Sequence, residues 1–364
     1  LKFPRSQLRS VVRQKRAILD SHRSSAMLAR RPMHRLALSG QVRLPSVQSA
    51  SQYVPMMPPP AYDPHMFLNM TRSANLITQS PASNWINLTK YPLDDLRSPL
   101  RQKLITDCKE QLADDGCCIV PGFLTQAALT KAVEEIESRQ LTDVYYLQGK
   151  NNIYFSNAND PSLPEDHPAR IEHYRSQGFI AGDSFHDSAS VLKQLFFFHP
   201  LKEFVSEILG ITPLYYSEDP LSGVMVSVQT PEQQFPWHFD GADFTVTILL
   251  QKPQHGGLFQ YVPNLRTESD ERLEEVRNVL HGRDTSRLKT LELGSGDLQI
   301  FRGKHSLHRV TSVEGTVNRY LATLMYTNVP GYVNTVERSR LNTGRVLACH
   351  YERDQVVAQG KLGS

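Results

Sequence analysis

The sequence of 364 residues lacks any apolar run of membrane length. Its longest apolar stretches, such as VTILL and QLFFF, are far shorter than the roughly 18 to 20 residues that a membrane helix needs. We therefore expect no membrane span. Because 40% of the residues are hydrophobic, the chain can bury a sizeable core, and we expect a soluble globular protein with one large domain or two smaller ones.

Cysteine is scarce, with Cys108, Cys117, Cys118 and Cys349 as the four positions. These cysteines show none of the paired spacings that are typical of metal sites. Cys117 and Cys118 are adjacent in the apolar run CCIV. We therefore predict reduced thiols in the core rather than disulfides.

Acidic residues are nearly absent from the N-terminal region. Its first 52 residues contain eleven Lys or Arg, many serines and a single acidic residue, Asp20. This composition is typical of an organelle transit peptide, and a basic tail such as a nucleic-acid arm is the alternative. The Pro-rich stretch YVPMMPPPAYDP follows. We predict a leader and linker over residues 1–74 and a folded domain over residues 75–364. If the leader is a transit peptide, the protein is directed to the mitochondrion or plastid; otherwise we expect a cytoplasmic protein.

The first part of the predicted domain has helical patterns. LRQKLITDCKEQLADDG predicts a helix that stops near Gly116, and CCIVPGF predicts a short buried strand. Thr125 can cap the next helix, QAALTKAVEEIES. Residues 140–190 are polar and irregular, which is typical of a long loop that covers a site. ASVLKQLFFFHPLKEFVSEILG then predicts a helical hairpin that ends at Gly210.

The second part changes to short strand patterns separated by Gly, Pro and charged turns. These patterns are GVMVSVQ, FTVTILLQ, GGLFQYVP, DLQIFRG, LHRVTSV and RYLATLMYTN. One charged and exposed helix, RTESDERLEEVRNVLHG, interrupts the series. Many short strands after a helical section predict an α+β protein built on a β-sandwich or barrel.

The stretch PWHFDGADFTVTILL places His238 and Asp240 two residues apart at the expected start of a strand. Alternate residues of a strand face the same side, so both side chains could hold one ion. His305 and His308 in GKHSLHRV offer a third ligand. Two histidines and one carboxylate form the facial triad of non-haem Fe(II) enzymes. Zinc hydrolases use similar ligands, so these residues alone do not fix the metal.

Arg319 lies eleven residues after His308 in HRVTSVEGTVNRYLATLMY. Its guanidinium group is suited to hold the distal carboxylate of a 2-oxo acid that chelates iron. The ordered pattern of H-x-D, G-G, H-x-V and Arg resembles the Fe(II)/2-oxoglutarate-dependent dioxygenases, whose core is a double-stranded β-helix, or jelly roll, of the cupin-like kind. WHFDGADFTVTILLQ and GKHSLHRVTSVEGTVNR look like the branch that contains free-amino-acid hydroxylases and halogenases. The resemblance covers residues 95–335, and it implies N-terminal helices packed on the core.

The resemblance implies a role for each matching residue. His238, Asp240 and His308, rather than His305, would bind Fe(II), and Arg319 would anchor 2-oxoglutarate, with O2 as co-substrate. This chain has Leu321 where many members of the family have a small hydroxyl residue. A second contact to 2-oxoglutarate must therefore come from another strand or from the strand before His308, and the candidates are Tyr215, Tyr216, Ser227, Gln229 and Arg302.

The implied activity is hydroxylation of a small polar molecule, an amino acid or a metabolite derived from one. Halogenases of this fold replace the carboxylate ligand by a small residue, so Asp240 argues against halogenation. Oxidative cyclisation of the kainoid-forming type is the alternative product outcome. A jelly-roll protein that binds a metal without catalysis is a second hypothesis, and nucleic-acid oxygenation, which has only the basic leader in its favour, is a third. Candidate substrate contacts are Trp237, Phe239, Asp243, Arg175, His186 and Arg302.

Overall fold

The computed structural model describes residues 81–139, 142–185 and 187–358. The predicted leader over residues 1–74 lies outside these residues. Within them, no helix has both the length and the apolar character to cross a membrane. The helices are α3 (Pro99–Asp115), α4 (Gln126–Arg139), α5 (Val191–Phe196), α6 (His199–Leu209), α7 (Leu273–Leu280), α8 (Val336–Thr343) and α9 (Ala348–Ala358).

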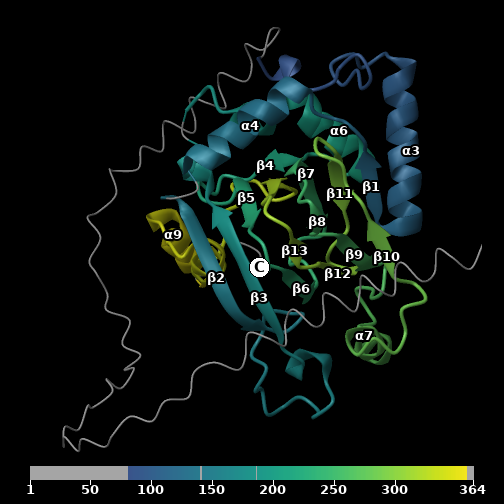
Figure 1. Cartoon of the computed structure of the whole chain (residues 1–364), viewed down its shortest axis with the longest axis vertical. Helices are drawn as coiled ribbons and strands as arrows, with labels where there is room; N and C mark the ends of the chain where they lie inside the picture. Colours follow the sequence, from purple (N-terminus) through teal and green to yellow (C-terminus); the bar gives the residue numbers. More distant parts are fainter. Residues whose placement is uncertain (1–80, 140–141, 186, 359–364) are drawn as a thin grey trace, which may run out of the picture. The chain divides into compact units, whose positions relative to one another are not determined.

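Two antiparallel sheets form the centre of the fold (Figure 1). The larger sheet has seven strands in the order β1 (Cys117–Val120), β11 (Leu298–Phe301), β7 (Thr245–Gln251), β14 (Arg319–Leu324), β5 (Val224–Gln229), β3 (His173–Ile180) and β2 (Val144–Asn151). The smaller sheet has the order β10 (Lys289–Leu291), β9 (Phe259–Val262), β12 (Leu307–Val310) and β6 (Phe235–His238).

The chain moves back and forth between the two sheets. Strands β5, β7, β11 and β14 lie in the larger sheet, and β6, β9, β10 and β12 lie in the smaller one. Two short pairs complete the strands: β8 (His255–Gly256) with β13 (Val313–Glu314), and β4 (Tyr215–Tyr216) with β15 (Tyr326–Thr327). This alternation is a double-stranded β-helix, so the predicted α+β jelly-roll fold is confirmed.

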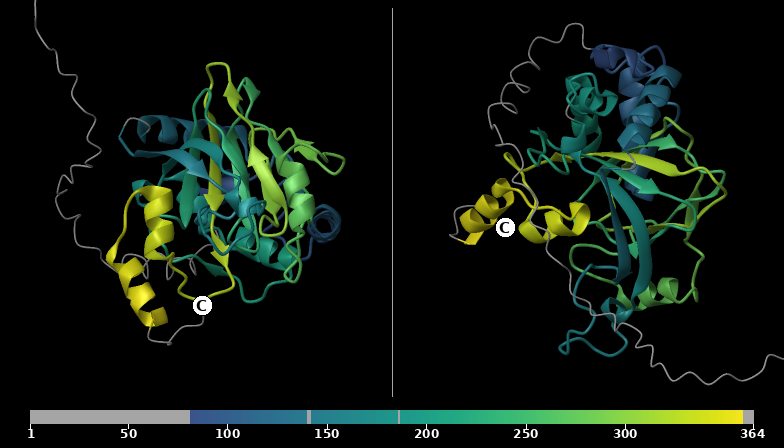
Figure 2. Two further views of the ribbon diagram at one scale, coloured as in Figure 1. Left: turned by 90° about the horizontal axis from the view of Figure 1, so that it is seen from below. Right: turned by 60° about the vertical axis from the view of Figure 1, so that its left-hand side comes forward.

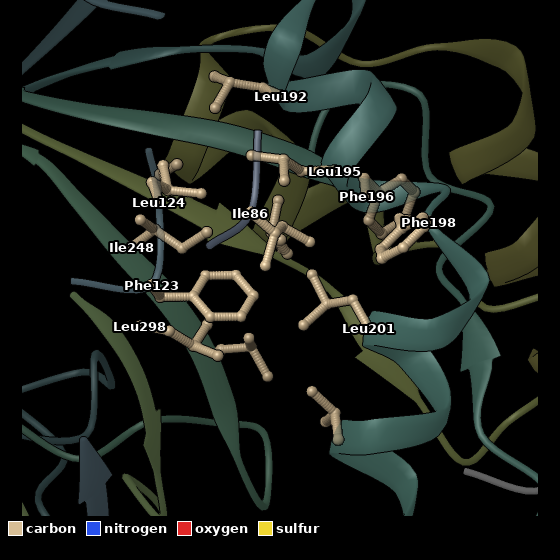
Figure 3. Close-up of a cluster of buried hydrophobic side chains, with 14 of the residues drawn as sticks. Ile86, Phe123, Leu124, Leu192, Leu195, Phe196, Phe198, Leu201, Ile248 and Leu298 are labelled. Atoms are coloured by element: carbon tan, nitrogen blue, oxygen red, sulfur yellow. The ribbon is translucent and has the colours of Figure 1, made fainter. Parts of the chain in front are cut away.

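The N-terminal helices pack on the larger sheet. Figure 3 shows Leu192, Leu195 and Leu201 from α5 and α6 gathered with Ile248 of β7 and Leu298 of β11. All five side chains are fully buried. Because the sheet has apolar side chains on its outer face, it needs this helical layer, and removal of the apolar surface from water stabilises the two layers together.

Most of the predicted elements are present. Helix α3 ends at Gly116, whose positive φ of 65° suits glycine, and Thr125 accepts a hydrogen bond from the amide of Ala128 at the start of α4. Gly210 likewise ends α6. Three of the cysteines are buried, and all four are free thiols, as predicted.

Three local predictions were wrong. Residues 140–190 contain the long β2–β3 hairpin, which extends the larger sheet, because its backbone pairs with β5 despite polar side chains. The charged helix α7 is not fully exposed, because it buries Val276 and Val279. His238 ends β6 instead of starting a strand, because the chain leaves the smaller sheet there and enters the larger one at Thr245.

Candidate metal centre and its cavity

Strands β6 and β12 bring two histidines together. His238 is the last residue of β6, and it lies directly opposite His308 of β12 in the antiparallel register. Asp240 follows two residues after His238, in the connection to the larger sheet. Its Oδ1 lies 3.7 Å from Nε2 of His238 and 3.5 Å from Nε2 of His308. One nitrogen or oxygen of each side chain lies within 4.8 Å of the other two, as a shared ion requires.

The main chain orients both imidazole rings. Nδ1 of His238 lies 2.8 Å from the carbonyl oxygen of Pro236, and Nδ1 of His308 lies 2.9 Å from that of Ser306. A carbonyl oxygen can only accept, so each Nδ1 carries the proton and donates it. Each Nε2 is then left with a free lone pair facing Asp240. Hydrogen bonding of the far ring nitrogen is the usual way in which proteins orient histidines that bind metals.

The carboxylate of Asp240 is positioned by Thr245 and Gly303. The hydroxyl of Thr245 donates to Oδ2 over 2.8 Å, which leaves Oδ1 for the histidines. The amide of Asp240 donates to the carbonyl of Gly303 over 3.0 Å. A Cβ atom at position 303 would lie 1.9 Å from Oδ2, so only glycine allows the carboxylate this close. The carboxylate thus has one oxygen fixed by the protein and one available to a cation.

The surroundings set the charges of the ligands. Burial lowers the pKa of His238 well below its ordinary value, and the neighbouring His308 lowers it further, so this imidazole is neutral. Burial raises the pKa of Asp240, but the adjacent His308, His238 and Thr245 lower it more, and the pKa ends below the ordinary value. A neutral imidazole and an ionised carboxylate are the forms that bind a metal. The residues present therefore fit a divalent transition metal.

A cavity of about 390 Å³ lies beside these ligands. Small-molecule sites commonly enclose roughly 300 to 1,000 Å³. Both sheets contribute to its wall, so the ligands face the interior of the jelly roll. The lining residues include Phe235, His238, Phe259 and His308 of the smaller sheet, and Ser227, Gln229, Thr247, Gln299, Arg319 and Leu321 of the larger sheet.

Arg319 and Gln229 form a buried polar pair in this cavity. They lie opposite each other where β14 pairs with β5, and Nη1 of Arg319 donates to Oε1 of Gln229 over 3.1 Å. Nε of Arg319 and Nε2 of Gln229 are buried without any hydrogen-bond partner. Burial lowers the pKa of Arg319 to about 10, so its guanidinium stays charged at neutral pH. Two unpaired donors beside one buried cation fit a carboxylate ligand.

The structure brings some of the other predicted residues to the cavity and leaves others away from it. Arg175 and Asp243 line it. Ser227, a weaker candidate for 2-oxoglutarate, also lines it. Tyr216 packs on Phe196 and Phe197 instead. His186 lies outside the described residues.

Like Tyr216, four other predicted contacts are not among the described residues that line the cavity. Trp237 packs in a separate hydrophobic cluster and lies under Arg309. Phe239 stacks on Tyr154 in the same outer cluster. Arg302 is exposed just past β11, and Tyr215 pairs with Thr327 at the edge of the fold.

Sequence reasoning missed several residues of the site. Thr245 and Gly303 hold the carboxylate, and Arg338 and Asn334 line the cavity from the C-terminal segment. A glycine directly after a strand is a general sign of close approach, which could have drawn attention to Gly303. The C-terminal residues have no motif that ties them to the strands.

The sequence matches a model of a known protein family. The family model described as Halogenase D matches residues 168–342, which run from just before β3 into α8. The match agrees with the resemblance to Fe(II)/2-oxoglutarate-dependent oxygenases. The matched span contains His238, Asp240 and His308 of the candidate metal centre, together with Arg319. No curated protein sequence matches the chain.

Several solved structures with low sequence identity have a similar fold. The non-haem α-ketoglutarate-dependent epimerase SnoN from nogalamycin biosynthesis is 11% identical, with a TM-score of 0.44, and the match covers 62% of this chain and 83% of SnoN. A prolyl hydroxylase from Trichoplax adhaerens is 18% identical, with a TM-score of 0.41 and coverage of 65% and 96%. HygX from Streptomyces hygroscopicus, with nickel and 2-oxoglutarate bound, is 15% identical, with a TM-score of 0.39 and coverage of 60% and 85%.

Proposed function

We propose that the protein is an Fe(II)- and 2-oxoglutarate-dependent oxygenase. The observation that carries this proposal is the joint presence, in one cavity, of the His238, Asp240 and His308 cluster and of the Arg319 and Gln229 pair. A metal that serves structure alone tends to have all its positions filled by protein ligands. Here three protein ligands face a cavity, which leaves room for a chelating co-substrate and O2.

Each residue has a defined part in this function. Nε2 of both histidines and Oδ1 of Asp240 would hold the iron. When bound, iron and 2-oxoglutarate supply the activation of O2 and the oxidation of a C–H bond, with succinate and CO2 as the products of 2-oxoglutarate. Arg319 and Gln229 would hold the distal carboxylate through their unpaired donors. Of the second contacts considered from the sequence, Gln229 is the one whose position favours this role.

The substrate that we propose is a small polar molecule, an amino acid or a metabolite derived from one. Hydroxylation is the expected outcome, because Asp240 occupies the place that a halide would need. The family model carries the word halogenase in its description, but the carboxylate of Asp240 faces both histidines. Oxidative cyclisation uses the same ligands, and the mass of the product distinguishes the two, with a gain of one oxygen for hydroxylation and a loss of two hydrogens for cyclisation.

The first test is succinate formation by the purified protein with Fe(II), 2-oxoglutarate and a panel of amino acids. We expect wild-type turnover to rise with a substrate, and His308→Ala to lose it by about 100-fold or more, because an open metal site binds iron weakly. His305→Ala is the matched control. His305 lies three residues away, is partly exposed and contacts Glu268, so this variant should keep its activity. Full turnover by His308→Ala would contradict the proposal.

A metal-binding jelly roll without catalysis is the competing function. The two unpaired donors of Arg319 and Gln229 argue against it, because burying them without a ligand is costly. Titration of 2-oxoglutarate into the Mn(II)-loaded protein separates the two functions. An oxygenase should bind it, and Arg319→Gln should weaken binding by at least about tenfold. No binding by the wild type would favour the competing function.

We further propose that the basic leader directs the protein to the mitochondrion or plastid. Its composition is the support for this proposal, with eleven basic residues and one acidic residue in the first 52. A fusion of residues 1–74 to a fluorescent protein tests it directly. Cytosolic fluorescence would contradict organelle targeting.

A further inference from the structure

Besides Arg319, two arginines line the cavity without an acidic partner among the described residues. Arg175 comes from β3 and Arg338 from α8, and neither forms an ion pair with any Asp or Glu of the described residues. The two carboxylates that also line the cavity are engaged elsewhere. Asp240 faces the two histidines, and Asp243 binds Lys304 at 2.9 Å. Arg175 is buried and Arg338 is half-buried. Charges that are removed from water are normally paired, so these two cations, which lie in the same cavity as Arg319, require an explanation.

The guanidinium of Arg175 is fixed by neutral groups. It is only 4% exposed, and it stacks 4.3 Å from the ring centre of Phe235, with the rings of Phe155 and Phe179 within 5.6 Å. With the amide of Gln177 turned so that its oxygen faces Arg175, that oxygen accepts from Nε over 2.9 Å and from Nη2 over 2.7 Å. These contacts orient the cation, but none of them neutralises its charge.

Arg338 reaches the cavity from the C-terminal segment. It lies in the first turn of α8, where its amide donates to the capping hydroxyl of Thr335 over 3.0 Å. Its guanidinium lies directly over Gly241, because a Cβ atom there would lie 2.0 Å from Nη2. The side chain therefore ends beside the loop that follows Asp240. Figure 2 shows α8 and α9 in yellow, and α8 contacts β3, which carries Arg175.

The two arginines are close enough to repel each other. Burial lowers the pKa of Arg175 to about 9, and the positive charge of Arg338 is the next cause. With this pKa, Arg175 remains charged at neutral pH. Their repulsion disappears when an anion lies between them, and guanidinium groups bind carboxylate and phosphate oxygens in two parallel hydrogen bonds.

We propose that Arg175 and Arg338 together bind an acidic group of the substrate, so that the oxidised molecule is an anion and α8 is part of its binding site. This inference rests on the proposed oxygenase function and adds the charge of the substrate. Arg319 is not needed for this role, because Gln229 and its own unpaired donor assign it to the co-substrate. The substrate then enters with its acidic end beside α8 and its reacting carbon toward the metal ligands.

Thermal unfolding of the full chain loaded with Mn(II) and 2-oxoglutarate tests the inference. The probes are L-lysine and L-leucine, each beside its α-amide, and glycerol 3-phosphate beside glycerol. We expect at least one free acid or the phosphate ester to raise the unfolding temperature, while its partner that lacks the acidic group does not. A response to a free acid or to the phosphate ester identifies the acidic group as a carboxylate or a phosphate. Equal effects of a probe and of its partner without the acidic group would overturn the inference.

Substitutions test which residues bind the acidic probe. Arg338→Gln and Arg175→Gln should each weaken binding of the acidic probe by at least about tenfold. Gly241→Ala should act in the same way, because its Cβ displaces the guanidinium of Arg338. Arg340→Gln, at an exposed position of the same helix, is the matched control and should bind normally.

Two further measurements distinguish the ways in which the inference could be wrong. Without added anion, Arg338→Gln should unfold at the same temperature as the wild type or higher, because it removes repulsion. A clear drop would show that Arg338 serves structure and would overturn the inference. Binding of 2-oxoglutarate should persist in both glutamine variants, and its loss would assign the two arginines to the co-substrate. Failure of the wild type to bind 2-oxoglutarate at all would instead contradict the proposed oxygenase function.

Discussion

At the scale of single residues, the candidate metal centre depends on close approach as much as on its three ligands. Oδ2 of Asp240 lies where a side chain at position 303 would otherwise be. The Thr245 hydroxyl then fixes the rotation of the carboxylate. A sequence motif identifies which residues could donate to a metal. The positions of the donor atoms, however, depend on neighbours such as Gly303 and Thr245, which are not metal ligands themselves.

Gly303→Ala tests this dependence. The added Cβ collides with the carboxylate of Asp240, so the side chain must rotate away from the histidines. We expect Mn(II) affinity, measured by calorimetry, to fall about 10- to 100-fold while the fold persists. Gly149→Ala in β2 is the control, because a Cβ there has nothing within 4 Å. Unchanged affinity in Gly303→Ala would mean that Oδ2 has no fixed place in the metal site.

At the scale of elements, the C-terminal helices are held by one buried pair. Nε2 of His350 in α9 lies 3.2 Å from Oδ2 of Asp219, and both side chains are fully buried. The same Oδ2 accepts from the amide of Asn334, just before α8. Oδ1 accepts from the amides of Leu221 and Ser222. Asp219 thus links α8 and α9 to the loop before β5.

His350→Ala should loosen α8 and α9. Loss of one buried hydrogen-bond partner costs about 1 to 3 kcal/mol of the free energy of unfolding. Because α8 carries Arg338, binding of the acidic probe should weaken, while Mn(II) affinity stays unchanged. His199→Ala, on the exposed face of α6, is the control and should do neither. Hydrogen exchange of α8 and α9 measures the loosening, and equal protection in both variants would contradict it.

The same pair predicts how stability depends on pH. Burial raises the pKa of Asp219, but the hydrogen bonds from His350 and from main-chain amides outweigh it and lower the pKa below 3.8. A carboxyl with a lowered folded pKa stabilises the fold above its unfolded pKa and loses this effect as the pH falls through the folded value. The Asp219→Asn variant should therefore have a lower free energy of unfolding than the wild type near neutral pH, and this difference should become smaller below about pH 4. Denaturant unfolding measures the difference. A difference that is constant from pH 7 to pH 3 would contradict this role.

Much of the fold and part of the site could be predicted from the sequence. Periodicity and capping residues such as Thr125 and Gly116 placed the helices, and the H-x-D and H-x-V motifs identified the three residues that meet in the candidate metal centre. The β2–β3 hairpin was not predicted, because pairing with β5 orders its backbone while its side chains remain polar. The place of Arg338 in the cavity was not predicted either, because nothing in its local sequence indicates that α8 lies against β3.

At the scale of the whole molecule, every residue that we place in the site lies between Arg175 and Arg338. This span agrees closely with residues 168–342, which the family model matches. The described helices α3 to α6 support the larger sheet from outside, and they contribute no ligand to the candidate metal centre. The folded part should therefore carry the chemistry without the basic leader.

Removal of residues 1–74 tests this division. We expect the shortened chain to bind Mn(II) and 2-oxoglutarate with affinities within about twofold of the full chain, because every residue that we place in the site lies within residues 175–338. Calorimetric titration of both proteins measures this. A large loss of affinity would place part of the leader at the site.

The main-chain carbonyls that orient His238 and His308 have one more consequence. Because Pro236 and Ser306 act through their backbones, no substitution at these two positions takes away the oxygen that holds each ring. Under the proposed function, iron binding and substrate choice should then be partly separable. Changes at cavity positions such as Arg175 and Arg338 should alter which molecule binds while these carbonyl oxygens still orient the two histidines, so the scaffold is a favourable starting point for new specificities in evolution or in the laboratory.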